Sequence, residues 1–236
     1  MATTKANGVA GKNGNSKVER ITIPAPTVEG LLGENHISIA APKVITATYR
    51  LTGNAPLVVN KFSAKAREQI RRTQEAGPQA KKGKIREPKD FQLCYNQARH
   101  ISTEGWDGIA APAFRNAMID ACRMVGFKMT HAKCSVFVVA DGIDADEGTP
   151  LVRIHGEPRY AEHCVRNDSG VVDIRARPLY AEWFVDLNVK FNADQFTLTD
   201  VGHLLMHAGI SIGVGEGRPF SKNSAGQGWG TFDVTF

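Results

Sequence analysis

The stretch that decides the fold is Leu179–Phe236, which reads LYAEWFVDLNVKFNADQFTLTDVGHLLMHAGISIGVGEGRPFSKNSAGQGWGTFDVTF. From Leu179 to Phe191 every odd-numbered position is apolar, whereas Glu182 and most of the later even-numbered positions are polar or charged. A period of two residues is typical of a strand that packs one face on a core. The pattern therefore predicts one continuous strand over residues 179–191.

The same stretch continues with a predicted helix and a last strand. Thr199 and Asp200 are suitable cap residues for a helix over residues 199–208, and Gly209 is a suitable residue to end it. The final residues then alternate between apolar and polar, which predicts a strand over residues 230–236.

A glycine-rich loop lies between that helix and the last strand. It holds six glycines in eighteen residues, namely Gly213, Gly215, Gly217, Gly226, Gly228 and Gly230. Glycine permits a positive φ, and free N–H groups in such loops can hold phosphate. Dinucleotide and P-loop motifs follow a strand and open a helix, whereas this loop follows a helix and opens a strand. We therefore expect no nucleotide cofactor, and a structural turn and a phosphate-binding loop remain as alternatives.

Composition restricts the class of protein. The 236 residues are 42% hydrophobic, which suffices for one large domain with a core. A net charge of +5 allows an anionic partner, and no apolar run reaches the length of a membrane span or forms a secretory signal. We expect a cytoplasmic protein of a bacterium or phage-infected cell, with no membrane partner. The cysteines lack zinc-site spacing and are expected to be reduced thiols: Cys94, Cys122, Cys134 and Cys164.

Charge is distributed unevenly along the chain. Residues 1–20 are polar and basic and predict a disordered tail, followed by a single domain over residues 21–236. Residues 61–99 contain eleven basic and four acidic residues, a net +7 that exceeds the charge of the whole chain. The pattern predicts a clamp for a phosphate backbone, with a solvated helix and loop as the alternative. Its expected phosphate-binding residues are Lys61, Lys65, Arg67, Arg71, Arg72, Lys81, Lys82, Lys84 and Arg86, and Phe62 is expected to stack on bases.

Other segments predict the remaining core. Residues 43–51 and 134–140 read as strands, and residues 112–125 read as an amphipathic helix with Pro112 in its first turn. The acidic run Asp141–Glu147 predicts a hairpin turn, because its order does not match a calcium loop. Short strands at 151–154 and 171–177 are predicted to flank a loop carrying His155, Arg159, His163 and Arg166.

The predicted elements follow the order β-α-β-β-α-β. This is the order of an α+β, ferredoxin-like core, here with two large insertions at residues 52–105 and 141–178. His203 and His207 are four residues apart on a predicted helix but lack a third ligand, so we expect no metal site.

Two motifs resemble the RAMP superfamily, the repeat-associated proteins of CRISPR effector complexes. The run Gly108–Ala117 (GIAAPAFRNA) is similar to the strand–turn–helix entry of that superfamily. Gly213-Val-Gly215 and Gly228-Trp-Gly230 resemble its paired glycine motif before the final strand. Residues 177–183 and 208–219 also resemble uncharacterised phage and prophage proteins. The resemblance covers residues 43–60 and 105–236, and the polar run at 220–225 departs from the pattern.

The resemblance implies a ferredoxin-like palm, protomers stacked in a helical filament, and single-stranded nucleic acid laid across the palms. We therefore expect a non-enzymatic protein that binds single-stranded RNA or DNA, with itself and other effector subunits as partners. A CRISPR-effector-backbone role and a role in phage recombination or defence are both open. Arg115, Arg177 and Arg218 are the expected phosphate contacts on the palm, with the ring of Tyr180 as a second stacking platform.

Two alternatives belong to other classes. A metal-independent endoribonuclease of the same superfamily would need a general base near the glycine loop, and His131 is one candidate. A phage assembly protein would form oligomers without nucleic acid. The sequence does not separate RNA from DNA, because recognition of a 2′-hydroxyl depends on geometry.

Overall fold

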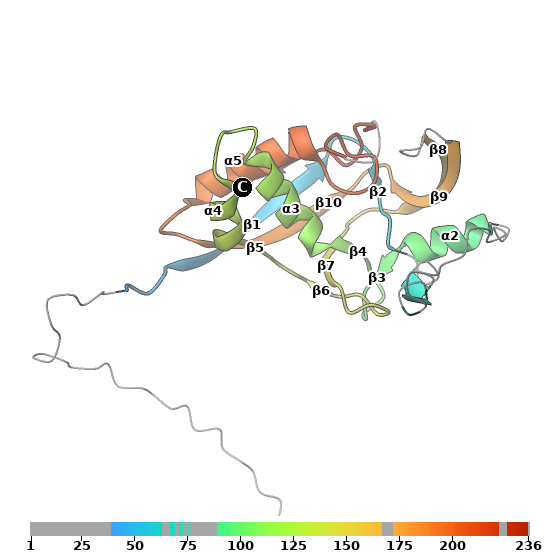
Figure 1. Cartoon of the computed structure of the whole chain (residues 1–236), viewed down its shortest axis with the longest axis horizontal. Helices are drawn as coiled ribbons and strands as arrows, with labels where there is room; N and C mark the ends of the chain where they lie inside the picture. Colours follow the sequence, from blue (N-terminus) through green and yellow to red (C-terminus); the bar gives the residue numbers. More distant parts are fainter. Residues whose placement is uncertain are drawn as a thin grey trace, which may run out of the picture. The chain divides into compact units, whose positions relative to one another are not determined.

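A computed structural model describes residues 39–62, 67–68, 71–72, 75, 89–166, 172–221 and 226–235 (Figure 1). The predicted tail at 1–20 lies outside the described residues, as do the predicted phosphate contacts Lys65, Lys81, Lys82, Lys84 and Arg86. The elements described here belong to one compact unit that begins at Ala41. The unit is mixed α/β, and its strands pair antiparallel.

The central sheet is formed by segments from both ends of this unit. Its strand order is β11-β1-β10-β5, with β1 at Val44–Gly53, β5 at Val136–Val139, β10 at Phe184–Asn192 and β11 at Phe232–Thr235. β1 pairs with β10 over nine positions, with Tyr49 opposite Leu187 and Leu51 opposite Val185. These side chains are buried, whereas the intervening residues of β1 are exposed, so one face of the sheet carries the core.

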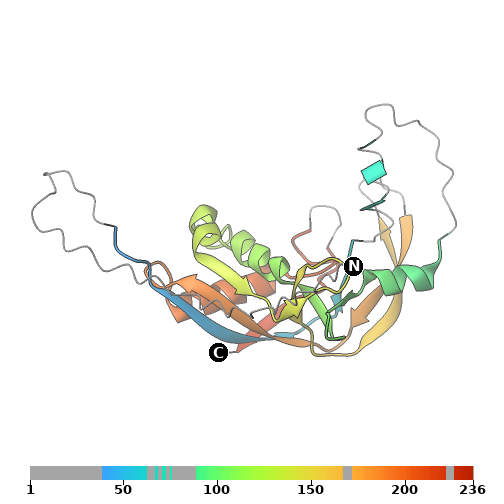
Figure 2. The ribbon, with the colours of Figure 1, turned by 90° about the horizontal axis from the view of Figure 1, so that it is seen from below.

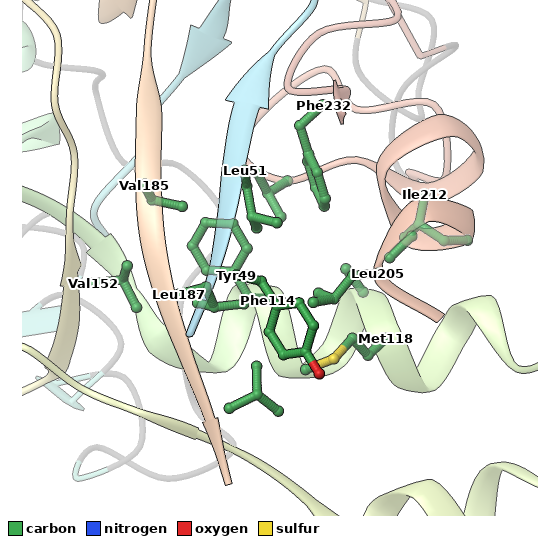
Figure 3. Packing of buried hydrophobic residues seen from close by; sticks show 14 of the residues in the cluster. Tyr49, Leu51, Phe114, Met118, Val152, Val185, Leu187, Leu205, Ile212 and Phe232 are labelled. Atoms are coloured by element: carbon green, nitrogen blue, oxygen red, sulfur yellow. The ribbon is translucent and has the colours of Figure 1, made fainter. Parts of the chain in front are cut away.

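Helices α3 (Ala111–Ala121) and α5 (Leu198–His207) cover the buried face of the central sheet (Figure 2). Phe114 and Met118 of α3 meet Leu205 of α5 and the sheet residues Tyr49 and Leu187 in one cluster (Figure 3). α5 begins with the capping box formed by Thr197 and Asp200. Burial of this cluster removes apolar surface from water and fixes the positions of the loops at the helix ends.

Two smaller sheets are built from the residues inserted into this arrangement. One has the order β2-β9-β8, with β2 at Leu57–Val58, β8 at Pro158–Arg166 and β9 at Val172–Tyr180. The other has the order β3-β4-β7-β6, with β3 at His100–Ile101, β4 at Asp107–Ala110, β6 at Gly142–Ile143 and β7 at Pro150–Arg153. Helix α2 (Phe91–Ala98) packs against β9, and α4 (Met129–Ser135) precedes β5.

The predicted single strand over residues 179–191 is two strands, so that prediction is wrong in its extent. β9 ends at Tyr180 and β10 begins at Phe184. Trp183 in the break is buried, and its indole Nε1 donates a 2.9 Å hydrogen bond to the carbonyl of Ala55. The turn keeps an odd-numbered side chain in the core, so the apolar alternation continues although the chain changes sheets.

Four other predicted boundaries are corrected. The strand predicted from residue 134 begins at Val136, because Cys134 and Ser135 end α4. The loop predicted to carry His163 is strand β8 over most of its length. The predicted helix at 112–125 ends at Ala121 and is followed by a turn. The predicted last strand at 230–236 begins only at Phe232, within the described residues.

Gly209 does not end α5, because the chain continues as the π-helical turn η2 (Ala208–Ile212). A Cβ on Gly209 would lie 2.1 Å from the carbonyl oxygen of Phe232, so the glycine allows a close contact with β11. Gly213, with φ of 68°, ends the helical segment instead. Among the described residues, no helix has both the length and the apolar character needed to cross a membrane.

Candidate nucleic-acid interface

A pocket of about 350 Å³ lies where several segments of the unit meet. Its walls come from the start of α3, the glycine loop, the β8–β9 hairpin, the residues after β2, and His100 at the start of β3. A volume of this size is in the range of pockets that hold small organic molecules or a nucleotide. The pocket is therefore the candidate site.

The N-terminus of α3 forms one wall, through Ala110 and Ala113. Ala110 is the N-cap residue, and no side chain caps the helix. The first N–H groups of a helix have no partner within the helix, and they carry a partial positive charge. Strand β4 leads directly into this turn, so its pairing with β7 holds the uncapped end in place.

The glycine loop forms a second wall. All six of its glycines have positive φ values, between 61° and 79°. The N–H of Val214 donates to the carbonyl of Gly230 at 2.9 Å, and the N–H of Gly230 donates to Pro56 at 2.8 Å. A Cβ on Gly230 would lie 1.8 Å from the carbonyl oxygen of Val214. The two glycine segments are thus packed backbone to backbone, and Gly215 and Gly217 line the pocket.

The six glycines therefore have different surroundings. Gly213 and Gly230 are buried behind the pocket wall, where they permit the close backbone contact. Gly228 is exposed and has no neighbour within 4 Å of an added Cβ. The predicted phosphate-binding role falls on Gly215 and Gly217, because these two line the pocket.

Arg218 supplies a positive charge to the pocket. Its Nη1 donates to the carbonyl of Gly215 at 3.1 Å, and it forms no salt bridge with a described residue. Arg175 also lines the pocket, but it contacts Glu216 at 2.6 Å. Arg177 contacts the other oxygen of Glu216 at 2.8 Å. Burial of the Glu216 carboxyl opposes its ionisation, but the two arginines outweigh this effect and lower its pKa.

Trp229 provides an aromatic wall between Gly228 and Gly230. The imidazole of His163 lies behind it, with ring centroids 4.6 Å apart. Nε2 of His163 is buried and has no hydrogen-bond partner in the described part of the chain, and burial lowers its pKa. A neutral ring in this place supports the indole without adding charge to the pocket.

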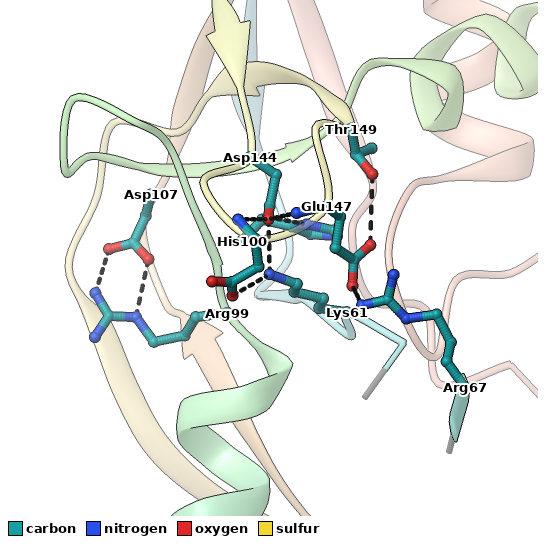
Figure 4. Close-up of polar contacts among 9 residues, drawn as sticks. Lys61, Arg67, Arg99, His100, Asp107, Asp144, Glu147 and Thr149 are labelled. Carbon is teal, nitrogen blue, oxygen red and sulfur yellow. Dashed lines mark hydrogen bonds and ion pairs between the residues drawn. The ribbon is translucent and has the colours of Figure 1, made fainter. Parts of the chain in front are cut away.

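A buried ionic cluster adjoins the pocket at His100 (Figure 4). The Asp144 side chain has 0% exposure. Nζ of Lys61 lies 2.8 Å from one of its oxygens, and Nδ1 of His100 lies 2.9 Å from the other. The backbone N–H groups of Asp146 and Glu147 also donate to Asp144. Burial opposes ionisation of Asp144, but these donors hold its pKa at about 2.

Of the predicted clamp residues that the structure describes, Lys61 is buried, whereas the three arginines are exposed and paired with carboxylates. Lys61 is 7% exposed, and its ammonium is bound to Asp144 and Asp146. Arg67 pairs with Glu147, and the exposed Arg71 and Arg72 pair with Glu75 and Glu68 one helical turn away. Phe62 is 54% exposed and accessible to a base.

The predicted palm residues are also separated. Arg115 donates to the carbonyls of Lys133 and Val136, and thereby ties α3 to α4 and β5. Arg177 contacts Glu216 beside the pocket. Tyr180 is 1% exposed, so its ring is not accessible to a base, and burial raises its pKa. Arg218 is the predicted palm arginine that lines the pocket.

Sequence reasoning missed Arg175, Trp229 and His100 as pocket residues. Arg175 and Arg177 are two apart on a strand, a spacing that places both on one face toward a common acid. Trp229 lies between two glycines of the recognised loop, so its role was detectable from that context. No local signal marks His100, because its partner Asp144 is 44 residues away. The candidate general base His131 is exposed on α4, and does not line the pocket.

The chain matches no protein-family model and no curated protein sequence. In the described segments, no group of three or more histidine, cysteine, aspartate or glutamate side chains is placed to hold a metal ion. The functional interpretation therefore depends on the geometry of the pocket.

The glycine contact gives a first prediction. Gly230→Ala is expected to lower the free energy of unfolding by about 3 kcal/mol, because the methyl group meets a backbone carbonyl at positive φ. Gly228→Ala, at a similar φ in open space, is expected to lower it by about 1 kcal/mol. Urea unfolding measures both variants. Equal losses of unfolding free energy in the two variants would show that the two glycine segments are not in contact.

The ionic cluster gives a second prediction. Asp144→Asn leaves a buried lysine without its main partner and is expected to cost about 3–5 kcal/mol of unfolding free energy. Asp146→Asn is the matched control, because that side chain is 81% exposed, and is expected to cost less than about 1 kcal/mol.

The same cluster predicts acid sensitivity. The pKa of Asp144 is about 2 in the folded chain and 3.8 as the ordinary value. As pH falls, the unfolded chain therefore binds this proton at a higher pH than the folded chain does. The contribution of the carboxylate to the free energy of unfolding is present above about pH 4 and is lost as pH falls toward 2. Urea unfolding of wild type and Asp144→Asn across this range measures the difference. Parallel pH profiles would contradict the assignment.

Proposed function

We propose that the protein binds single-stranded nucleic acid at the pocket without cleaving it, and that copies assemble along the strand as a helical filament. One observation carries this proposal. An uncapped helix N-terminus, the guanidinium of Arg218 and the indole of Trp229 line the same cavity. Phosphate is attracted by the first two groups, and a base can stack on the third.

The charge pattern favours a strand over an isolated anion. Arg71 and Arg72 are exposed, and their salt bridges at the surface are weak. Each arginine can therefore leave its carboxylate and bind a phosphate, which releases counterions from the nucleic acid. Phe62 offers a second exposed ring. Phosphate contacts and stacking surfaces at several places suit an unpaired strand, because the faces of its bases are open.

We also propose that the central sheet with α3 and α5 is a ferredoxin-like core, and that the chain is a RAMP-like protein. The chain order β1, α3, β5, β10, α5, β11, together with the antiparallel sheet order β11-β1-β10-β5, supports this proposal. The run Gly108–Ala117 leads from β4 into α3 at the pocket, and Gly215 and Trp229 of the paired glycine motifs also line the pocket. We assign the gripping of the strand to the basic insertion, residues 61–99.

The endoribonuclease alternative has one observation in its favour. His100 lines the pocket with a carboxylate behind it, and this arrangement suits a general base. Incubation of the protein with single-stranded RNA in EDTA distinguishes the two functions. We expect intact RNA. Cleavage that is lost in His100→Ala would establish the enzyme.

Removal of the Arg218 charge tests the proposed site. Arg218→Ala is expected to weaken binding of labelled single-stranded oligonucleotides by about fivefold or more, and to reduce the salt slope by about 1. Lys190→Ala is the control, because Lys190 lies on β10 between two buried residues and faces the side of the central sheet opposite α3. It is expected to bind like wild type.

Fluorescence anisotropy at low and moderate salt measures this pair, and urea unfolding checks that both variants fold. An effect of Lys190→Ala equal to that of Arg218→Ala would place the strand elsewhere. Electron microscopy of the wild-type mixtures tests assembly. Oligomers that persist after nuclease treatment, without any binding, would support the phage-assembly alternative.

A further inference from the structure

Glu216 is the acidic residue among the described residues that line the pocket. It lies in the glycine loop between Gly215 and Gly217, and its side chain is 14% exposed. Its backbone N–H donates to the carbonyl of Val58 at 2.8 Å, which holds this part of the loop against the end of β2. A carboxylate in the wall of a pocket that attracts phosphate opposes the binding of anions, so it affects which anions the pocket accepts.

Two arginines hold the Glu216 carboxylate in place. Nη1 of Arg175 donates to one of its oxygens at 2.6 Å, and Nε of Arg177 donates to the other at 2.8 Å. Burial opposes ionisation of Glu216, but these arginines outweigh burial and lower its pKa. Arg175 also lies 3.5 Å from Asp173, which pairs with Lys89 as well. The Glu216 carboxylate is therefore ionised at neutral pH, and it cannot leave the wall without breaking two charged hydrogen bonds.

The charge of the pocket matches a single phosphodiester. The arginine and glutamate side chains that line it are Arg175, Arg218 and Glu216, so two positive charges and one negative charge leave +1. A phosphodiester carries one negative charge. A nucleoside triphosphate carries its phosphates next to one another, and its additional negative charges would meet the Glu216 carboxylate. Repulsion between like charges is strong in a partly buried site, because little water or salt screens it.

We propose that Glu216 makes the pocket selective for an isolated phosphodiester and excludes ligands with adjacent phosphates, such as nucleoside triphosphates and pyrophosphate. This inference rests on the proposed function, because it assumes that a phosphate of a nucleic-acid strand occupies the pocket. Glu216 is a specificity-determining residue that acts by repulsion. A free nucleoside triphosphate has the same base and sugar as a strand, and without this carboxylate its higher charge would make it a strong competitor.

The test measures how well AMP and ATP displace a labelled single-stranded oligonucleotide from the protein. The two competitors share their base and sugar, so a difference between them reports the adjacent phosphates alone. Fluorescence anisotropy is measured in EDTA, and salt is adjusted so that all samples have the same ionic strength. For wild type, we expect ATP to be at most about threefold more effective than AMP, despite its greater charge.

Two substitutions separate repulsion in the pocket from a general change of charge. Glu216→Gln removes the charge but keeps the size of the side chain and one oxygen that accepts hydrogen bonds. ATP is then expected to displace the strand at a concentration about tenfold or more below that of AMP. Asp173→Asn is the matched control, because Asp173 also contacts Arg175 but does not line the pocket. It is expected to keep the wild-type ratio, and urea unfolding checks that both variants fold.

The outcomes distinguish this inference from the proposed function. If ATP displaces the strand from wild type about tenfold more effectively than AMP, the role of Glu216 is overturned and strand binding stands. This measurement needs no variant. An unchanged ratio in Glu216→Gln, or an equal change in Asp173→Asn, also overturns the inference. Failure of wild type to bind the strand overturns both proposals.

Discussion

The buried carboxylate of Asp144 joins three segments that are distant in the sequence. Lys61 follows β2, His100 opens β3, and Asp144 follows β6. Lys61 and His100 each form a hydrogen bond with Asp144, at 2.8 and 2.9 Å respectively. A buried charge is tolerated only when it is paired and fully hydrogen-bonded, so these segments are fixed relative to one another. The edge of the pocket at His100 depends on this one group.

Salt bridges also change how the excess of basic residues at 61–99 is interpreted. Residues 61–99 have a net charge of +7, yet the described basic residues of this segment are largely engaged by carboxylates outside or within it. Lys89 reaches Asp173, and Arg99 forms a two-bond contact with Asp107. Charge that appears free in the sequence therefore ties the insertion to the rest of the unit. The proposed phosphate contact falls on Arg218 instead, from a segment with no charge cluster.

Periodicity in the sequence predicted those elements in which the pattern of buried and exposed residues repeats within the element itself. The alternation in β10 and the apolar face of α3 placed both elements, and the acidic turn was correctly predicted because β6 and β7 pair around it. The break at Trp183 escaped prediction because the tertiary hydrogen bond to Ala55 keeps the indole in the core across a change of sheet. Local pattern reports which face is buried, and it does not report which sheet buries it.

The site was only partly predictable for a related reason. Six glycines in eighteen residues identified the loop before its geometry was known, because positive φ leaves a mark on composition. The choice between Gly215, which lines the pocket, and Gly230, which meets a backbone carbonyl, depends on contacts with distant segments. Tyr180 and Lys61 have suitable chemistry for a nucleic-acid interface, but both are buried. Residue type indicates what a side chain can do, and burial decides whether a ligand reaches it.

Photochemical cross-linking of a bound single-stranded RNA, followed by mass spectrometry of the attached peptides, tests the central claim most directly. Binding at the pocket predicts cross-links to Trp229 and to the peptides that carry Gly215 and Arg218. Cross-links confined to Phe137 and Phe184, on the opposite face of the central sheet, would place the strand there and contradict the assignment of the pocket.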